Sequence, residues 1–214
     1  MNLHTHLHRY KSWLIIIGML CAGIICCWFA VILAQPNSPA ASAPTGSSAV
    51  NETPVTDDAK NNYTVANNRP QILTIPKLNI KTRIYGVGNT ANNAIATPAL
   101  LDDVGWYKAS ALPGRSGVAF INGHNQGKNR PGVFANLGSL KVGQNITIER
   151  GDGVILTYIV DDVMSQPVAN IDMQQLLMPT TVDEQTLVLM TCGGVYDRSE
   201  AQYDERVIVH ARLD

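Results

Sequence analysis

The sequence predicts an all-β domain, in the form of a closed or nearly closed barrel, behind a single membrane-spanning helix. From about residue 69 to the C-terminus, short runs rich in β-branched and aromatic residues alternate with turn residues, as they do in all-β domains. Helical patterns are scarce in the same stretch. Residues 13–34, in contrast, form one apolar run without a charged residue.

Seven segments of the C-terminal part carry the strand pattern. The Gly-Asp-Gly at 151–153 indicates a tight hairpin between two of them. Two short helical pieces are expected: one turn within 131–137, and a helix over 171–177 that Asn170 could cap. The predicted strands are 71–75, 82–87, 118–122, 145–150, 154–163, 187–191 and 207–213.

The apolar run at 13–34 is predicted to be a transmembrane signal anchor. At about 1.5 Å per residue, a helix of this length crosses the roughly 30 Å hydrocarbon core of a bilayer. Arg9 and Lys11 precede the run and no basic residue follows it until Lys60. The positive-inside rule therefore places residues 1–12 in the cytoplasm and the rest outside the cell. A cleaved signal peptide is the alternative, although its apolar part usually has only about 7 to 15 residues.

Residues 35–68 separate the anchor from the predicted barrel. They are rich in Pro, Ser, Ala, Thr and Asn and almost devoid of large apolar residues. Such a segment buries too little surface to offset its ordering entropy, so we expect a disordered stalk. The stalk would hold a catalytic domain, residues 69–214, away from the membrane.

The composition argues against nucleic-acid binding, and the placement of the cysteines draws attention to Cys192. The formal net charge is −1, without the basic excess of nucleic-acid-binding proteins. Three of the four cysteines lie inside the predicted span, so Cys192 would be alone outside the membrane. A single cysteine in an exported domain indicates either an intermolecular disulfide or a reactive thiol.

The context of Cys192 favours the reactive thiol. An apolar run and Thr191 precede it, and Gly193 and Gly194 follow it. This pattern is typical of a buried strand that delivers a cysteine to its end, where glycines leave the approach open. A buried structural cysteine at a strand end is the alternative interpretation.

A nucleophilic cysteine needs a base, because a free thiol is mostly protonated at neutral pH. His124 follows the predicted strand 118–122 and a glycine, and so lies at a strand end. His210 lies inside the predicted strand 207–213 and shares a face with Ile208 and Arg212, as expected of a surface or barrel histidine. We therefore favour His124 as the base.

A guanidinium can stabilise the oxyanion that forms when a thiolate attacks a carbonyl. Arg206 begins the last predicted strand, next to the strand of Cys192. Arg198 lies in the connecting loop beside Asp197, where a local salt bridge is an alternative. The sequence leaves the assignment open between the two, with Arg206 favoured.

A histidine, a Thr-Cys pair and an arginine in this order on short strands resemble the sortase family, over residues 69–214. Segment 189–192 is similar to the Leu-x-Thr-Cys signature of that family, and Gly123-His124 to its Gly-His strand end. Segments 105–107, 131–134 and 191–198 resemble class E/F sortases of actinobacteria.

This resemblance implies an eight-stranded sortase barrel with one or two short helices, and a cysteine transpeptidase that acts on peptide bonds. Cys192 would cleave a Leu-Pro-x-Thr-Gly-like sorting signal of a secreted protein through a thioester, with His124 as acid and base. Thr191 and Gly193 would position the substrate. An amine of a peptidoglycan precursor or a pilin would then accept the acyl group. No cofactor and no metal are implied.

Two other functions compete with this interpretation. A peptidoglycan L,D-transpeptidase is also an exported cysteine enzyme, but it would carry its cysteine in a Ser-x-Gly-Cys context, whereas Met190 and Thr191 precede Cys192 here. A stalked barrel could also be a non-catalytic cell-surface module for binding or assembly, with Cys192 as a passive residue.

Overall fold

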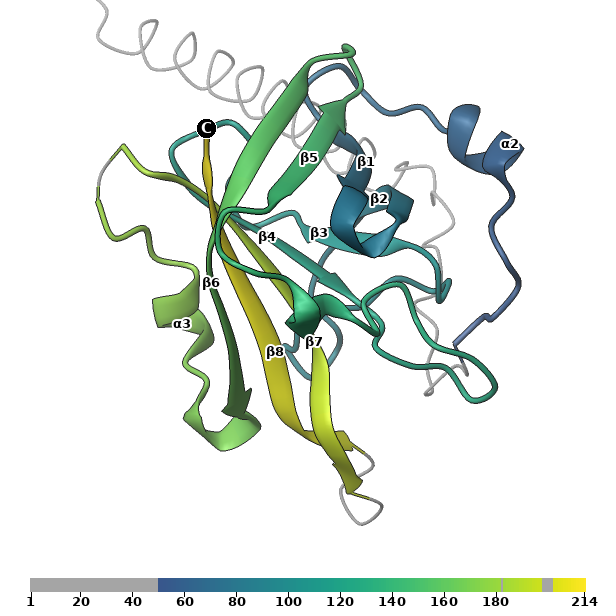
Figure 1. Cartoon of the computed structure of the whole chain (residues 1–214), viewed down its shortest axis with the longest axis vertical. Helices are drawn as coiled ribbons and strands as arrows, with labels where there is room; N and C mark the ends of the chain where they lie inside the picture. Colours follow the sequence, from purple (N-terminus) through teal and green to yellow (C-terminus); the bar gives the residue numbers. More distant parts are fainter. Residues whose placement is uncertain (1–49, 182, 198–201) are drawn as a thin grey trace, which may run out of the picture. The chain divides into compact units, whose positions relative to one another are not determined.

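The computed structural model describes residues 50–181, 183–197 and 202–214. Eight strands close into a barrel in the order β1-β2-β3-β4-β7-β8-β6-β5 (Figure 1). The β2–β3 and β4–β7 pairs are parallel and the other pairs are antiparallel. This confirms the predicted all-β, eight-stranded barrel. The strands are β1 (Pro70–Ile75), β2 (Ile80–Val87), β3 (Val104–Tyr107), β4 (Gly117–Gly123), β5 (Asn145–Arg150), β6 (Ile155–Pro167), β7 (Gln185–Asp197) and β8 (Gln202–Leu213).

The barrel interior is filled by the inward side chains of these strands. Leu73, Ile121, Ile148, Leu189 and Val209, from five different strands, are all fully buried in one cluster. Most are β-branched or leucine, which pack well on a pleated surface. Burial of their apolar area is the main stabilising term of the fold.

The outer face of β4, β7 and β8 carries a second apolar cluster, built on Val118, Phe120, Val188 and Ile208. The connection between β6 and β7, residues 168–184, covers part of this face and contributes partly buried side chains to the cluster. Because β4 and β7 are buried on both faces, their sequences are nearly continuous apolar runs rather than alternating ones.

The short helices lie in the connections. The helix expected over 171–177 is shorter, and Asp172 rather than Asn170 caps it, through N–H groups of Gln174 (2.9 Å) and Gln175 (3.1 Å). The turn expected within 131–137 forms there, with the N–H of Ala135 bonded to the carbonyl of Gly132 (3.1 Å) and that of Leu137 to the carbonyl of Phe134 (3.0 Å), and it leads into η2. The helical elements are α2 (Asp57–Asn61), η1 (Pro76–Leu78), η2 (Leu137–Ser139), η3 (Val168–Asn170) and α3 (Met173–Leu176).

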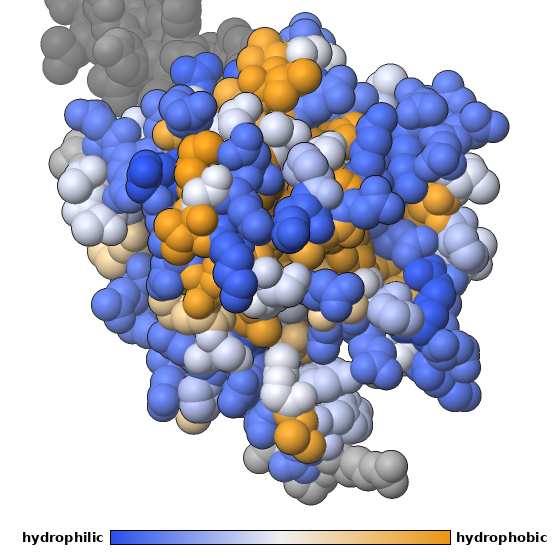
Figure 2. All heavy atoms as spheres, viewed as in Figure 1, coloured by the Kyte–Doolittle hydropathy of each residue, from blue (hydrophilic) through white to orange (hydrophobic). Residues whose placement is uncertain are grey.

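Four strands differ markedly from the sequence prediction. Strand β6 extends to Pro167 and β8 begins already at Gln202. The four-residue strand β3 was not predicted, since Gly105 interrupts the β-branched and aromatic pattern. Strand β7 does not end at Cys192 but continues to Asp197, past an irregularity between Gly193 and Tyr196. The β7–β8 hairpin therefore projects beyond the barrel (Figure 1), and Figure 2 shows a small hydrophobic patch on the projecting part. Val195, in the extended part of β7, is 73% exposed.

Residues 50–68, the last part of the predicted stalk, pack on the barrel. Thr56 caps helix α2, and the hydroxyl of Tyr63 donates a hydrogen bond to the carbonyl of Ile84 (2.8 Å). The compact folded unit accordingly spans Ala49–Asp214. A few long-range polar contacts thus order a segment whose composition alone favoured disorder.

The predicted cytoplasmic tail 1–12, the predicted anchor 13–34 and stalk residues 35–49 lie outside the described residues. Within the part of the chain that the structure describes, no helix is long and apolar enough to cross a bilayer.

Candidate active site

The site is built at the carboxyl ends of the parallel strands β4 and β7. Their register runs in step up to the pair Asn122–Met190. One residue further, the hydroxyl of Thr191 donates to the carbonyl of Gly123 (2.8 Å). The next residue on each chain is His124 and Cys192. These two predicted site residues therefore both follow directly on the last contact between the neighbouring strands.

Strand β8 supplies the third residue. Arg206 is the register partner of Cys192 in the antiparallel β7–β8 pair, so both side chains leave the sheet on the same face. Its Nη1 donates to the carbonyls of Glu205 (2.7 Å) and Tyr203 (2.9 Å), which holds the guanidinium against the backbone that precedes it. Cys192 and Arg206 thus lie on adjacent strands, and His124 follows the strand on the other side of β7. Arg198, the competing arginine, lies outside the described residues.

His124 is half-buried and its Nε2 lies 2.7 Å from the carbonyl oxygen of Pro98. A carbonyl only accepts hydrogen bonds, so this contact places a proton on Nε2. In the neutral ring the other nitrogen, Nδ1, is then free of a proton and can accept one from a thiol. Pro98 is a residue that the sequence analysis missed, because no local pattern relates it to a histidine 26 positions later.

Cys192 is partly exposed and is the one free cysteine among the described residues. It lines a cavity of about 660 Å³, together with Arg206. The other walls come from the β2–β3 connection, including Ile95, and from the β6–β7 connection, including Ile171 and Leu177. The volume is in the range typical of small-ligand sites, which are mostly apolar with a few polar groups. His124 itself does not line this cavity, but its neighbour Gly123 does.

Thr191 and Gly193, the two residues predicted to position substrate, both have a structural role. The hydroxyl of Thr191 is buried and bonded to Gly123, so it ties the cysteine strand to the histidine strand. A Cβ on Gly193 would lie 3.0 Å from Cγ2 of Val207, so this glycine allows β7 and β8 to approach closely. Gly194 has a φ of +73°, a conformation that glycine adopts without strain, in the irregular part of the strand.

Asn122 is a further site residue that was not singled out from the sequence. It lines the same cavity, is 5% exposed, and donates through Nδ2 to the carbonyl of Ala96 (3.0 Å). This bond holds the β2–β3 connection close to the end of β4. The Pro98 carbonyl that meets His124 lies two residues further along that connection.

His210, the alternative histidine, is not part of this arrangement. It lies within β8, in register with Val188 on one side and Asp162 on the other. Burial lowers the pKa of His210 below its ordinary value, with Asp162, Asp161 and Glu184 acting in the opposite direction. The structure thus agrees with its interpretation as a barrel histidine.

Known proteins resemble this chain in fold and in sequence. Residues 73–214 match the sortase domain family. Among solved structures the chain is similar to a lid mutant of sortase A from Corynebacterium diphtheriae, with 26% identity, a TM-score of 0.52, and coverage of 67% of this chain and 68% of that chain. None of the curated proteins compared with the chain matches it.

Two further solved structures show the likeness in fold. A lid mutant of sortase C1 from Streptococcus agalactiae is 22% identical, with a TM-score of 0.52 and coverage of 75% of this chain and 76% of that chain. Sortase C-1 from Actinomyces oris is 22% identical, with a TM-score of 0.52 and coverage of 67% and 72%. The family match includes β4, β7 and β8 and the residues His124, Cys192 and Arg206. The chain therefore belongs to the sortase family and is a cysteine transpeptidase.

Proposed function

We propose that this sortase cleaves a Leu-Pro-x-Thr-Gly-like sorting signal of a secreted protein and joins the new carboxyl end to an amine. The observation that carries this proposal is the pairing of Cys192 with Arg206 across β7 and β8, with His124 directly after the end of the neighbouring strand β4. A largely apolar cavity of about 660 Å³ adjoins Cys192 and suits the leucine and proline of such a signal.

In the acylation step, the thiol proton of Cys192 passes to Nδ1 of His124, and the sulfur attacks the carbonyl carbon of the threonine. The C–O electron pair moves to oxygen, and the guanidinium of Arg206 stabilises this oxyanion. Collapse of the tetrahedral intermediate breaks the Thr–Gly bond. The departing glycine amine takes the proton from His124, which leaves a thioester on Cys192.

In the second step an amine of a peptidoglycan precursor or of a pilin attacks the thioester carbon. His124, now neutral, accepts the proton that this amine loses. The second intermediate collapses with loss of the Cys192 thiolate, which yields an amide, and return of the proton from His124 to the sulfur restores the enzyme. If water replaces the amine, the same steps give hydrolysis.

The hydrogen bond from His124 to Pro98 gives the histidine a fixed tautomer for both steps. A carbonyl oxygen here takes the place that a carboxylate or amide occupies in other nucleophile–histidine sites. It accepts the Nε2 proton, so that Nδ1 is the nitrogen that exchanges protons with sulfur and amine.

We also propose a cellular location for this enzyme and a class within the sortase family. The apolar run 13–34 anchors the enzyme as a single-pass membrane protein, with the N-terminus in the cytoplasm and the barrel outside the cell. The motifs at 105–107, 131–134 and 191–198 favour class E/F within the sortase family. Secreted substrates with a C-terminal sorting signal are the partners that this location requires.

Mass spectrometry of the full chain in detergent, incubated with a panel of Leu-Pro-x-Thr-Gly-like peptides, tests the proposal. We expect an acyl adduct on Cys192 that hydroxylamine releases, and its absence from the Cys192→Ala variant. Addition of an amine should convert the adduct to an amide product. No adduct with any peptide would contradict the proposal and favour a non-catalytic binding or assembly module.

A further inference from the structure

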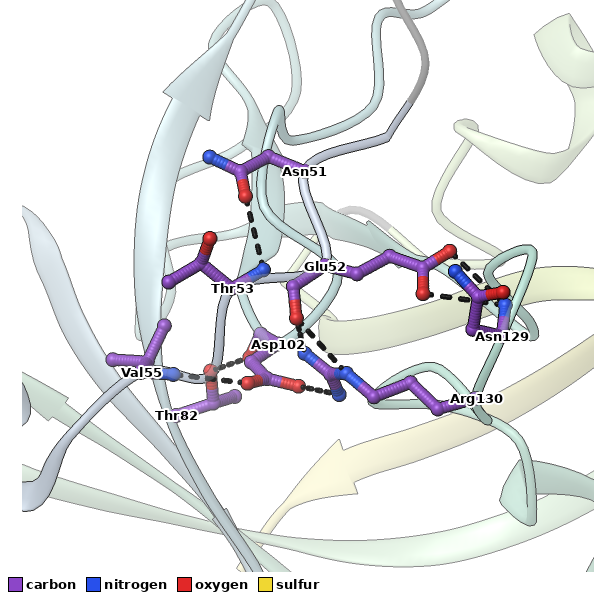
Figure 3. Close-up of polar contacts among 8 residues, drawn as sticks. All are labelled: Asn51, Glu52, Thr53, Val55, Thr82, Asp102, Asn129 and Arg130. Carbon is purple, nitrogen blue, oxygen red and sulfur yellow. Dashed lines mark hydrogen bonds and ion pairs between the residues drawn. The ribbon is translucent and has the colours of Figure 1, made fainter.

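Residues 51–55, here called the strap, lie against the β2–β3 connection, residues 88–103 (Figure 3). The N–H of Asn51 donates to the carbonyl of Ala99 (2.9 Å), and the N–H of Leu101 donates to the carbonyl of Asn51 (2.9 Å). The N–H of Val55 donates to the Asp102 carboxylate (3.0 Å). Three hydrogen bonds therefore attach the strap to this connection.

The strap also contacts the loop that follows His124. The Glu52 carboxylate accepts hydrogen bonds from the backbone N–H groups of Lys128 and Asn129. Arg130 donates to the carbonyl of Glu52 (2.8 and 3.1 Å) and to the Asp102 carboxylate (2.6 Å), so it joins the strap to both loops (Figure 3). Although burial raises the pKa of Asp102, hydrogen bonds from Arg130 and from the Val55 N–H lower it overall and keep the carboxylate charged.

These two loops are the ones that hold His124. The β2–β3 connection supplies the Pro98 carbonyl that accepts from Nε2. The loop after β4 returns to donate from the N–H of Phe134 to the carbonyl of His124 (2.9 Å), and a Cβ on Gly132 would overlap that same carbonyl oxygen. The position of His124 therefore depends on how the two loops are held together.

We propose that the strap is a positioning element for His124 and that Glu52 is its principal positioning residue. By holding the two loops together, the strap keeps the Pro98 carbonyl where it fixes the histidine tautomer. The inference rests on the proposed catalytic role of His124. The strap does not cover the substrate cavity, since the first residue along the described chain that lines this cavity is Asn89.

Replacing Glu52 in the full chain, kept in detergent, tests this inference. We expect Glu52→Ala to lower kcat for a sorting peptide about ten-fold, because a small displacement of a catalytic group is costly. KM should stay unchanged, since the cavity is untouched. Glu52→Gln keeps an acceptor oxygen and should restore most of the rate. Asp58→Ala is the matched control, because it removes one negative charge from an exposed residue of α2.

A second variant acts on the same contact from the loop side. A Cβ on Gly127 would lie 2.6 Å from Oε1 of Glu52 and 2.7 Å from Cδ2 of Leu101. Gly127→Ala should therefore displace the strap and lower kcat in the same way. A loss confined to thermal stability in both variants, with kcat intact, would show a purely structural role and overturn the inference.

Nitrogen NMR of ¹⁵N-histidine-labelled chain gives a readout that needs no substrate. His124, assigned through a His124→Gln variant, should be the Nε2–H tautomer in the wild type and a mixture of tautomers in Glu52→Ala. An unchanged His124 spectrum would overturn the inference even if sorting peptides are cleaved. A changed spectrum in a chain that cleaves no peptide would support the strap and contradict only the proposed function.

Discussion

Two cavities of similar volume share the outer face of the same strands, yet we propose chemistry in only one. The cavity beside Cys192, here the first, measures about 660 Å³ and the second about 670 Å³. Strand β7 contributes Cys192 to the first and Thr186 to the second, and β8 contributes Arg206 and His210 respectively. Ile171 lines both, so the β6–β7 connection divides the face between them.

The two cavities differ in their position along β4 and β7. The second lies over the amino ends, where His210 is fixed between Val188 and Asp162 inside the sheet. The first lies over the carboxyl ends, where β4 stops at Gly123 and the chain leaves the sheet. There His124 can meet both the neighbouring strand and the loops. Functional sites gather at the carboxyl ends of parallel strands in other folds for a similar reason.

The largest expected effect comes from the residues at the carboxyl ends. Cys192→Ala and His124→Ala should each reduce kcat/KM for a sorting peptide by about 10⁴-fold or more, as loss of the nucleophile or base does in other covalent enzymes. His210→Ala, at the other cavity, should leave kcat/KM unchanged. Steady-state kinetics with a fluorogenic peptide measure all three. A His210 effect as large as that of His124 would remove the distinction between the two cavities.

Arg206 should follow in size, because it faces the same cavity from β8. Arg206→Ala is expected to lower kcat roughly 10²–10³-fold, the usual consequence of removing one oxyanion donor. Arg206→Lys should recover part of the loss, since an ammonium keeps the charge but not the planar fork. The same measurement on Arg198→Ala decides between the two arginines. A larger loss there than for Arg206→Ala would transfer the proposed role to Arg198.

Local pattern was enough to predict the barrel and one of the two strand ends that it indicated. The apolar run before His124 does end a strand, since β4 stops at Gly123, whereas β7 continues past Cys192 to Asp197. The register that sets Arg206 beside Cys192 follows from a hairpin between neighbouring segments. The predictions that the structure confirms each depend on residues close together in the sequence.

The contacts around His124 could not be predicted in this way. The Glu52 carboxylate meets N–H groups 76 and 77 positions later, and Pro98 meets a histidine 26 positions later. No periodicity links such residues, and the composition of 35–68 predicted disorder instead. What orders residues 50–68 is contact with parts of the barrel far along the sequence, such as that of Tyr63 with Ile84.

Thr191 allows a test of how β4 and β7 are coupled at the catalytic end. Thr191→Val removes the hydroxyl and leaves the Gly123 carbonyl without that bond, which should lower the free energy of unfolding by about 1 to 3 kcal/mol. We also expect kcat to fall, because His124 and Cys192 follow directly on the two bonded residues. Thr191→Ser keeps the hydroxyl and should restore kcat. Chemical denaturation gives the free energy of unfolding, and peptide kinetics give kcat. A Thr191→Val variant with wild-type kcat would show that this hydrogen bond does not align His124 with Cys192.

The smallest expected effect belongs to the second cavity and concerns stability alone. Because burial lowers the pKa of His210 in the folded state, the unfolded chain binds this proton more readily than the folded one does. The wild type should therefore lose stability as the pH falls through the ordinary histidine pKa of about 6.5. In His210→Gln this pH-dependent contribution is absent. Between pH 7 and pH 5 the Tm of the wild type should therefore fall further than the Tm of the variant. If the Tm of the wild type and the Tm of His210→Gln fall in parallel with pH, His210 titrates as freely in the folded chain as in the unfolded chain. It would then be an exposed surface residue, and the contrast between a fixed histidine and a catalytic one would rest on His124 alone.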